Sequence, residues 1–323
     1  MDSFSRDHRE KHLITRGNVD GIVSAAMLLS AFPGSRVTFV TSPNAGARIM
    51  AMDRVSSEIY LADLAMVPEL EQVILAASER SEVVAFDHHQ PHEAPSLNGH
   101  LVIREGMSAA SVLYHHLGLP SKLRRLVAIA DLVEFCDTPL LEEQIAIHTK
   151  KRIEEEAKTL DFSWRLDIDD DAYRSQAALH LSQGLWPSEV GVIRRRYLQV
   201  LNEQRWPKAL ARVESHMRIR GPACVLHCKD KNRSLYGFGT RALVEVARDH
   251  RCDYAVMVNE RKAHSSVSLR CLSSEGINLG RFAEEFTEDH GLEGGGHPTS
   301  AGARIPVEET DRFLNDLIFL ASR

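Results

Sequence analysis

Short apolar runs alternate with longer runs of helical spacing through the first part of the chain. The strand-like runs are LIT from Leu13, RVTFV from Arg36, EIYLAD from Glu58, EVVAFD from Glu82 and LVIRE from Leu101. Segments such as IVSAAMLLSAF and LEQVILAAS, with apolar residues every three or four positions, separate them. This alternation predicts an α/β domain with a mostly parallel, doubly wound sheet over residues 1–140.

The pattern changes twice after this domain. Longer and more charged helical runs, including LEEQIAIHTKKRIEEEAKTL, fill residues 141–221 and predict a helical extension and linker. Mixed strand-like and helical runs return from ACVLHC onward, and they predict a smaller α/β domain over residues 222–323. The length of 323 residues also favours two domains, because a single core usually stops growing at about 250 to 300 residues. We expect a functional cleft between them.

Composition narrows the range of functions. The chain is 43% hydrophobic and 26% charged, which is typical of a soluble globular protein. A net charge of −6 gives no indication of the basic surface that proteins use to bind long nucleic acid. Five cysteines without paired CxxC spacing are expected to be reduced thiols, and no apolar signal segment or membrane-length run occurs. We therefore expect a cytoplasmic protein without a membrane partner.

Acidic residues follow the predicted strands. Asp20, Asp63 and Asp87 each lie at or just after the C-terminal end of a strand, the edge at which open α/β sheets bind ligands. Asp87 continues into His88 and His89, and a carboxylate beside two imidazoles is suited to holding a metal. The alternative is a solvated turn with incidental histidines, or a turn-forming or helix-capping Asp in the case of Asp63.

Two further polar positions stand out in the first domain. Asp131 lies in the helical run LRRLVAIADLVEF on the apolar face, where a carboxylate costs several kcal/mol to bury unless it is paired, protonated or bound to metal. A satisfied core Asp is an equally open interpretation. Asn18 and Asp20 occupy a glycine-flanked strand-to-helix turn, where capping of the helix is the alternative to ligand binding.

The second domain contains one dense glycine motif. Gly294, Gly295, Gly296 and His297 precede Pro298 and the residues TSAG. Exposed backbone N–H groups and small side chains would make an anion nest suited to phosphate or sugar oxygens. A flexible loop is the alternative, although Pro298 stiffens the segment.

Together these motifs resemble the DHH phosphoesterase family, in the branch with the DHH-associated C-terminal domain. The resemblance implies a two-metal phosphodiesterase, usually manganese-dependent with Mg²⁺ as an alternative, related to RecJ-type exonucleases, nano-RNases and cyclic dinucleotide phosphodiesterases. It implies that Asp63 bridges the metals, that Asp20, His88 and Asp131 complete one site, and that Asp87 and His89 support it or face the phosphate. It also implies that Arg270 and the segment Gly294 to His297 hold the phosphate or terminal nucleotide of a short oligonucleotide or dinucleotide. A homodimer is compatible with these expectations.

One motif departs from the family pattern. Members typically show His-Gly-Asp-x-Asp-Gly, whereas this chain has Arg16 for the His and Asn18 for the first Asp. Asn can offer a neutral oxygen to a cation and Arg cannot ligate one, so the second metal site is expected to be weak or empty. Three hypotheses follow: a one-metal enzyme in which Arg16 stabilises phosphoryl charge, a degenerate member that binds nucleotide or nucleic acid without hydrolysis, and a polyphosphatase or pyrophosphatase.

Overall fold

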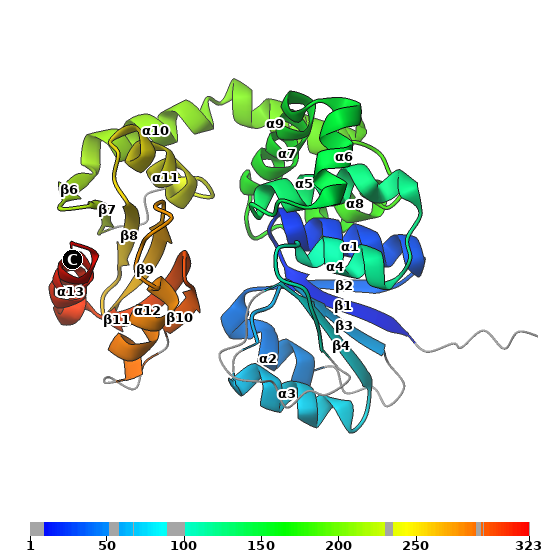
Figure 1. The fold of residues 1–323 in the computed structure, drawn as a ribbon, viewed down its shortest axis with the longest axis horizontal. Helices are drawn as coiled ribbons and strands as arrows, with labels where there is room; N and C mark the ends of the chain where they lie inside the picture. Colours follow the sequence, from blue (N-terminus) through cyan, green and yellow to red (C-terminus); the bar gives the residue numbers. More distant parts are fainter. Residues whose placement is uncertain are drawn as a thin grey trace, which may run out of the picture. The chain divides into compact units, whose positions relative to one another are not determined.

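The computed structural model describes residues 10–51, 58–66, 68–88, 101–229, 235–288, 292 and 294–322. Contacts divide the chain into two compact units, Met1–Leu198 and Gln199–Arg323, and each is described by itself (Figure 1). The predicted three-part division at 140 and 221 stays a prediction.

The first unit contains a five-stranded sheet in the order β2-β1-β3-β4-β5, and every neighbouring pair is parallel. The predicted parallel sheet is therefore confirmed. Because all strands run in one direction, the residues at their carboxyl ends meet at one edge. The strands are β1 (Lys11–Arg16), β2 (Arg36–Val40), β3 (Glu58–Ala62), β4 (Glu82–Asp87) and β5 (Leu101–Ile103).

Helices cover both faces of this sheet (Figure 1). Successive strand residues point to opposite faces, so Leu13 joins the core formed with α1, α4 and α5, while Ile14 joins the core formed with α2 and α3. The doubly wound arrangement follows from strands that are apolar on both sides. The helices are α1 (Val19–Ala31), α2 (Ser42–Met50), α3 (Pro68–Ser78), α4 (Ala109–His116) and α5 (Arg124–Val133), with a 3₁₀ turn at Ser121–Leu123.

The predicted helical run LEEQIAIHTKKRIEEEAKTL is two helices, not one. Thr149 breaks it with a left-handed φ of 70°, and its side chain caps the second helix by accepting a hydrogen bond from Arg152 N at 3.3 Å. The helices that follow α5 include α7 and α8, whose apolar residues join the core around α1. Their bounds are α6 (Pro139–His148), α7 (Lys150–Arg165), α8 (Asp171–Leu181), a 3₁₀ turn at Pro187–Glu189, and α9 (Gly191–Asn202).

The second unit contains a six-stranded sheet in the order β10-β11-β9-β8-β7-β6, in which only β7 and β8 pair in parallel among the described strands. Its core includes a cluster of three rings, with Phe313 4.9 Å from both Phe282 and Phe286 between centroids. This confirms the predicted second α/β pattern. The elements are α10 (Arg205–His216), β6 (Arg218–Arg220), β7 (Ala223–Cys228), α11 (Gly239–Asp249), β8 (Tyr254–Glu260), β9 (His264–Cys271), α12 (Leu279–Glu288), β10 (Gly294–His297), β11 (Ser300–Pro306), a 3₁₀ turn at Val307–Glu309, and α13 (Thr310–Ala321).

Among the described residues, no helix is both long enough and apolar enough to span a membrane.

Candidate metal centre

The turn between β1 and α1 places Asp20 at the carboxyl edge of the sheet. Asn18 caps α1, because its Oδ1 accepts a hydrogen bond from Gly21 N at 2.9 Å. A Cβ on Gly21 would lie 1.8 Å from the carbonyl oxygen of Arg16, so only glycine allows this close approach. Asn18 thus takes the capping role that was the alternative to metal binding, and its role as a ligand stays a prediction.

Asp63 follows β3 with a left-handed backbone. Its φ is 54°, its side chain is 1% exposed, and its N–H donates to Phe86 O at 3.2 Å. Residues other than glycine rarely adopt this conformation, and at a functional site such strain persists because the surrounding structure fixes it. Asp tolerates the conformation better than most residues, so the turn can hold the carboxylate in a defined direction.

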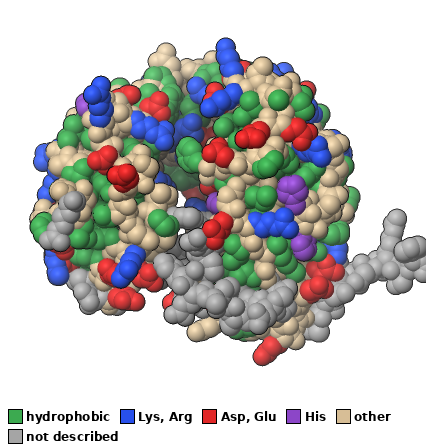
Figure 2. Space-filling view, in the orientation of Figure 1, with side chains coloured by type: hydrophobic (Ala, Val, Ile, Leu, Met, Phe, Trp, Pro, Cys, Tyr) green, Lys and Arg blue, Asp and Glu red, His purple; other side chains and the backbone are tan. Residues whose placement is uncertain are grey.

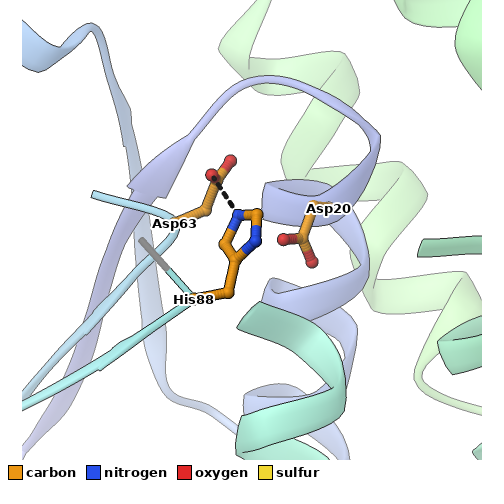
Figure 3. A group of neighbouring side chains, drawn as sticks. All are labelled: Asp20, Asp63 and His88. Atoms are coloured by element: carbon orange, nitrogen blue, oxygen red, sulfur yellow. Dashed lines mark ion pairs between the residues drawn. The ribbon is translucent and has the colours of Figure 1, made fainter. Parts of the chain in front are cut away.

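Asp20, Asp63 and His88 meet at this edge. Each offers one ligand atom such that all three atoms lie within 4.8 Å of one another (Figure 3). His88 Nε2 lies 3.9 Å from Asp63 Oδ1, and both carboxylates are almost fully buried. Two carboxylates and one imidazole are the oxygen and nitrogen donors that manganese and similar divalent cations accept. The donor set therefore fits a divalent cation.

The electrostatics of this group favour added positive charge. Burial raises the pKa of Asp20 well above its usual range, and the charges of Asp63 and Glu134 raise it further. Burial lowers the pKa of His88, but the nearby carboxylate of Asp63, the thiol of Cys136 and the charges of Asp20 and Asp87 outweigh it and raise this pKa to about 11. Without a cation, an imidazolium therefore partly compensates the carboxylates, and a divalent ion would take over that task by displacing the proton.

The amino end of α4 orients Asp20. Ala109 N and Ala110 N donate to its two carboxylate oxygens, each at 2.9 Å. Backbone N–H groups at a helix start carry partial positive charge, so they stabilise a carboxylate there and fix its direction. Asp20 is thus held from two elements that are about 90 residues apart in the sequence.

The structure does not bring Asp131 into the group. Its Oδ1 accepts hydrogen bonds from Ser108 N at 3.0 Å and Ser108 Oγ at 2.6 Å, and its Oδ2 accepts one from Thr138 Oγ1 at 2.7 Å. This buried carboxylate is satisfied by neighbouring hydroxyls, which was the alternative to metal binding. It ties α5 to the start of α4 next to the amides that hold Asp20, and its predicted role as a ligand stays a prediction.

Arg16 lies beside the group at the end of β1. Its Nη1 is 3.8 Å from Asp63 Oδ1, and 42% of its side chain is exposed. Asp87 ends β4, is fully buried, and its charge contributes to the raised pKa of His88. His89 lies outside the described residues.

Two residues of this site were missed by the sequence analysis. Glu134 and Cys136 follow α5, where the charge of Glu134 raises the pKa of Asp20 and the thiol of Cys136 raises the pKa of His88. The one available signal was their position directly after the helix that carries Asp131. A single carboxylate and a single thiol in a loop are otherwise unremarkable in sequence.

The glycine motif of the second unit forms a strand. Gly294–His297 is the edge strand β10, and it pairs with β11 across a two-residue turn, Pro298 and Thr299. A Cβ on Gly294 would lie 2.6 Å from Ala283 O, which explains one glycine by close packing against α12. The motif is thus one strand of a β-hairpin, and its role as an anion nest stays a prediction.

Arg270 lies in the same row of this sheet as the end of β10. It pairs with Ser300 of β11, which in turn pairs with His297. Arg270 Nη1 donates to Leu269 O at 2.7 Å. The side chain of His297 lies outside the described part of the chain, and the substrate-binding roles of Arg270 and Gly294 to His297 stay predictions.

Comparisons with known proteins agree with this fold. Residues 247–321 match the DHHA1 domain family. The structure of a pGpG-specific phosphodiesterase, PggH from Vibrio cholerae, is similar with a TM-score of 0.60 and 16% identity, over 96% of this chain and 98% of that one. The DHHA1 match covers the C-terminal part of the chain, and together with this likeness it supports the resemblance to DHH phosphoesterases and shows their fold.

Other solved DHH-type structures are also similar. A DHH domain described as belonging to a member of a family of ribosomal proteins gives a TM-score of 0.70 at 13% identity, over 98% of this chain and 87% of that one. An exopolyphosphatase-related protein from Bacteroides fragilis gives 0.54 at 14% identity, over 96% and 92%. No curated protein matches the sequence significantly. Identities this low show the fold alone, and the activity of this protein has to be argued from the site.

Proposed function

We propose that this protein is a metal-dependent phosphoesterase that hydrolyses phosphodiester bonds of short oligonucleotides or of linear or cyclic dinucleotides. The observation that carries the proposal is the buried group of Asp20, Asp63 and His88, whose ligand atoms lie within 4.8 Å of one another. Manganese is the expected cation, with magnesium as an alternative, because carboxylate-rich sites suit both ions.

The three side chains would hold one cation and leave coordination positions for substrate and water. A divalent cation bound there would polarise a phosphoryl oxygen and lower the pKa of water. Asp20 is oriented for this task by the α4 amides, and Asp63 by its left-handed turn. His88 would act as a neutral ligand after losing its proton.

Arg16 is placed to contact the substrate. Its guanidinium lies 3.8 Å from Asp63 and is 42% exposed, so it can hydrogen-bond to phosphate oxygens without losing its position. In this account Arg16 stabilises the charge that develops on the phosphoryl group, in the place where the family pattern has a metal-binding histidine. The protein would then work with one tightly held cation.

Two observations favour small substrates. The similar solved structures include proteins named as a pGpG-specific phosphodiesterase and as exopolyphosphatase-related. Acidic and basic side chains are interspersed on the face shown in Figure 2, and the net charge is −6. A protein that grips long nucleic acid usually gathers basic residues on one face.

A second candidate function is nucleotide binding without hydrolysis. The Arg16–Asp63 ion pair and the capping role of Asn18 favour it, since both reduce the donors available for a second cation. Phosphoester hydrolysis that normally relies on two metals would then be lost while the phosphate-binding groups remain.

A substrate panel separates these candidates. The purified protein with Mn²⁺ would be assayed against pGpG, a cyclic dinucleotide, a short oligonucleotide, tripolyphosphate and pyrophosphate, beside Asp63→Asn and the control Glu143→Gln. Glu143 is an exposed carboxylate of the same unit, paired with Arg124 at 2.8 Å. Hydrolysis of a nucleotide that Asp63→Asn abolishes and Glu143→Gln keeps supports the proposal. Binding without hydrolysis supports the second candidate, and preference for tripolyphosphate or pyrophosphate would overturn the substrate class.

A further inference from the structure

The loop after α5 exposes an aromatic ring on a strained backbone. Phe135 has a φ of 57°, in the left-handed region, and is 82% exposed. A bulky residue is a genuine outlier there, and a large apolar side chain is seldom left so open to water. Neither feature contributes to the core, and strain that serves no packing purpose points to a functional role.

The loop is fixed beside the metal centre. Cys136 N donates to Asp131 O at 2.9 Å and Phe135 N donates to Leu132 O at 3.3 Å, so the chain turns tightly at the end of α5. The carboxylate of Asp131 is itself held by Ser108 and Thr138. The exposed ring therefore stands on a rigid base.

Hydrogen bonds connect the loop of Phe135 to the metal group. Cys136 N donates to Asp131 O, the carboxylate of Asp131 accepts from Ser108, and Ala109, the residue after Ser108, donates its N–H to Asp20. The charge of Glu134 also raises the pKa of Asp20. Consecutive Cα atoms are about 3.8 Å apart, so the backbone of Phe135 lies next to the residue that anchors this network. Phe135 thus lies in the loop beside the centre, with its ring open to solvent.

We propose that Phe135 is a specificity-determining residue that stacks on a nucleobase of the substrate while the adjoining phosphate lies at Asp20, Asp63 and His88. This inference rests on the proposed function and narrows its substrate class. A phenyl ring offers no favourable contact to polyphosphate or pyrophosphate, which have no apolar face. Every nucleobase has a flat face that stacks on aromatic side chains with little dependence on sequence. Phe135 would therefore select nucleotides over inorganic phosphates.

Two substitutions separate stacking from folding. Phe135→Asn removes the ring but suits the left-handed backbone, so the melting temperature should stay the same or rise. Phe135→Tyr keeps an aromatic face. We expect Phe135→Asn to raise KM for pGpG roughly tenfold or more, the scale of losing one base–aromatic stack, with kcat changed by less than about threefold. Phe135→Tyr should stay within about threefold of the parent in KM. Any hydrolysis of tripolyphosphate should be unaffected by either change.

The outcomes also separate this inference from the proposed function. If the parent protein hydrolyses nothing, the proposed hydrolysis fails, and Phe135 is judged by equilibrium dialysis of pGpG, where Phe135→Asn must again weaken binding. An unchanged KM or Kd in Phe135→Asn would overturn the stacking role. The stacking role would also be overturned if Phe135→Asn lost as much activity toward tripolyphosphate as toward pGpG, or if a lowered melting temperature explained the loss. It would equally be overturned if Phe135→Tyr bound pGpG as weakly as Phe135→Asn, or if the parent protein did not bind pGpG.

Discussion

Replacing Asp63 with Asn removes one negative charge from the metal centre with little change of shape. Asn also tolerates the φ of 54° at this position, so the backbone should keep its turn. In the cation-free protein the change removes both repulsion from Asp20 and attraction to Arg16 and His88. Because these effects oppose each other, we expect the melting temperature without metal to change little.

The effect on metal binding should be large. Mn²⁺ at about 100 times its Kd stabilises the folded protein by about 2.7 kcal/mol. For a unit the size of Met1–Leu198, about 1 kcal/mol shifts the melting temperature by about 2–4 °C, so the parent should gain about 5–11 °C. Two unit charges about 4 Å apart in a partly buried site interact by about 4 kcal/mol, so losing one carboxylate should raise the Kd on the order of 100-fold or more. At the same Mn²⁺ concentration about 0.4 kcal/mol then remains, a shift under about 2 °C.

Thermal unfolding with and without Mn²⁺ measures this difference directly. Glu143→Gln serves as the matched control, because it removes an exposed carboxylate from the same unit and should keep the full Mn²⁺ shift. An Asp63→Asn variant that retains the shift of the parent would refute the assignment of Asp63 as a ligand.

Three further predictions concern the supports of this centre. Gly21→Ala should lower the free energy of unfolding in urea by at least about 3 kcal/mol, because the new Cβ would meet Arg16 O at 1.8 Å. The control Gly46→Ala, inside α2, should leave this free energy unchanged or raise it. Similar values for both variants would contradict the close-approach argument. Ser108→Ala should lower the free energy of unfolding by about 2–4 kcal/mol in the same assay, since it removes the α4 cap and a hydrogen bond to buried Asp131. A decrease of less than about 0.5 kcal/mol would contradict the role of these hydrogen bonds. Mn²⁺ affinity should rise with pH between about 6.5 and 8.5, because the pKa of cation-free His88 is raised to about 11 and its proton must leave when the cation binds. Titration calorimetry in two buffers of different ionisation enthalpy should detect the released proton. A pH-independent Kd without proton release would contradict the assignment of His88 as a ligand.

The fold of the first unit could be predicted because its pattern is local. Runs such as LIT and EVVAFD are apolar on both faces, and the helical runs between them leave a parallel sheet as the simple solution. The placement of Asp20, Asp63 and His88 followed, since the carboxyl ends of parallel strands meet at one edge.

Other features depended on contacts that sequence spacing does not encode. Asp131 was a candidate ligand because its burial was predictable, but the hydroxyls of Ser108 and Thr138 that satisfy it are 23 and 7 residues away. The glycines at 294 to 296 were expected to form an anion nest, and their spacing did not show that the pairing of β10 with β11 makes them an edge strand. Thr149 carries no glycine-like signal, yet it breaks a helical run through a left-handed backbone.

The most direct test of the metal centre is diffraction from a crystal grown with Mn²⁺, with data collected at the manganese absorption edge. The account predicts an anomalous peak within about 2.5 Å of one oxygen of Asp20, one oxygen of Asp63 and one imidazole nitrogen of His88. Manganese bound elsewhere, with no peak among these three side chains, would contradict it.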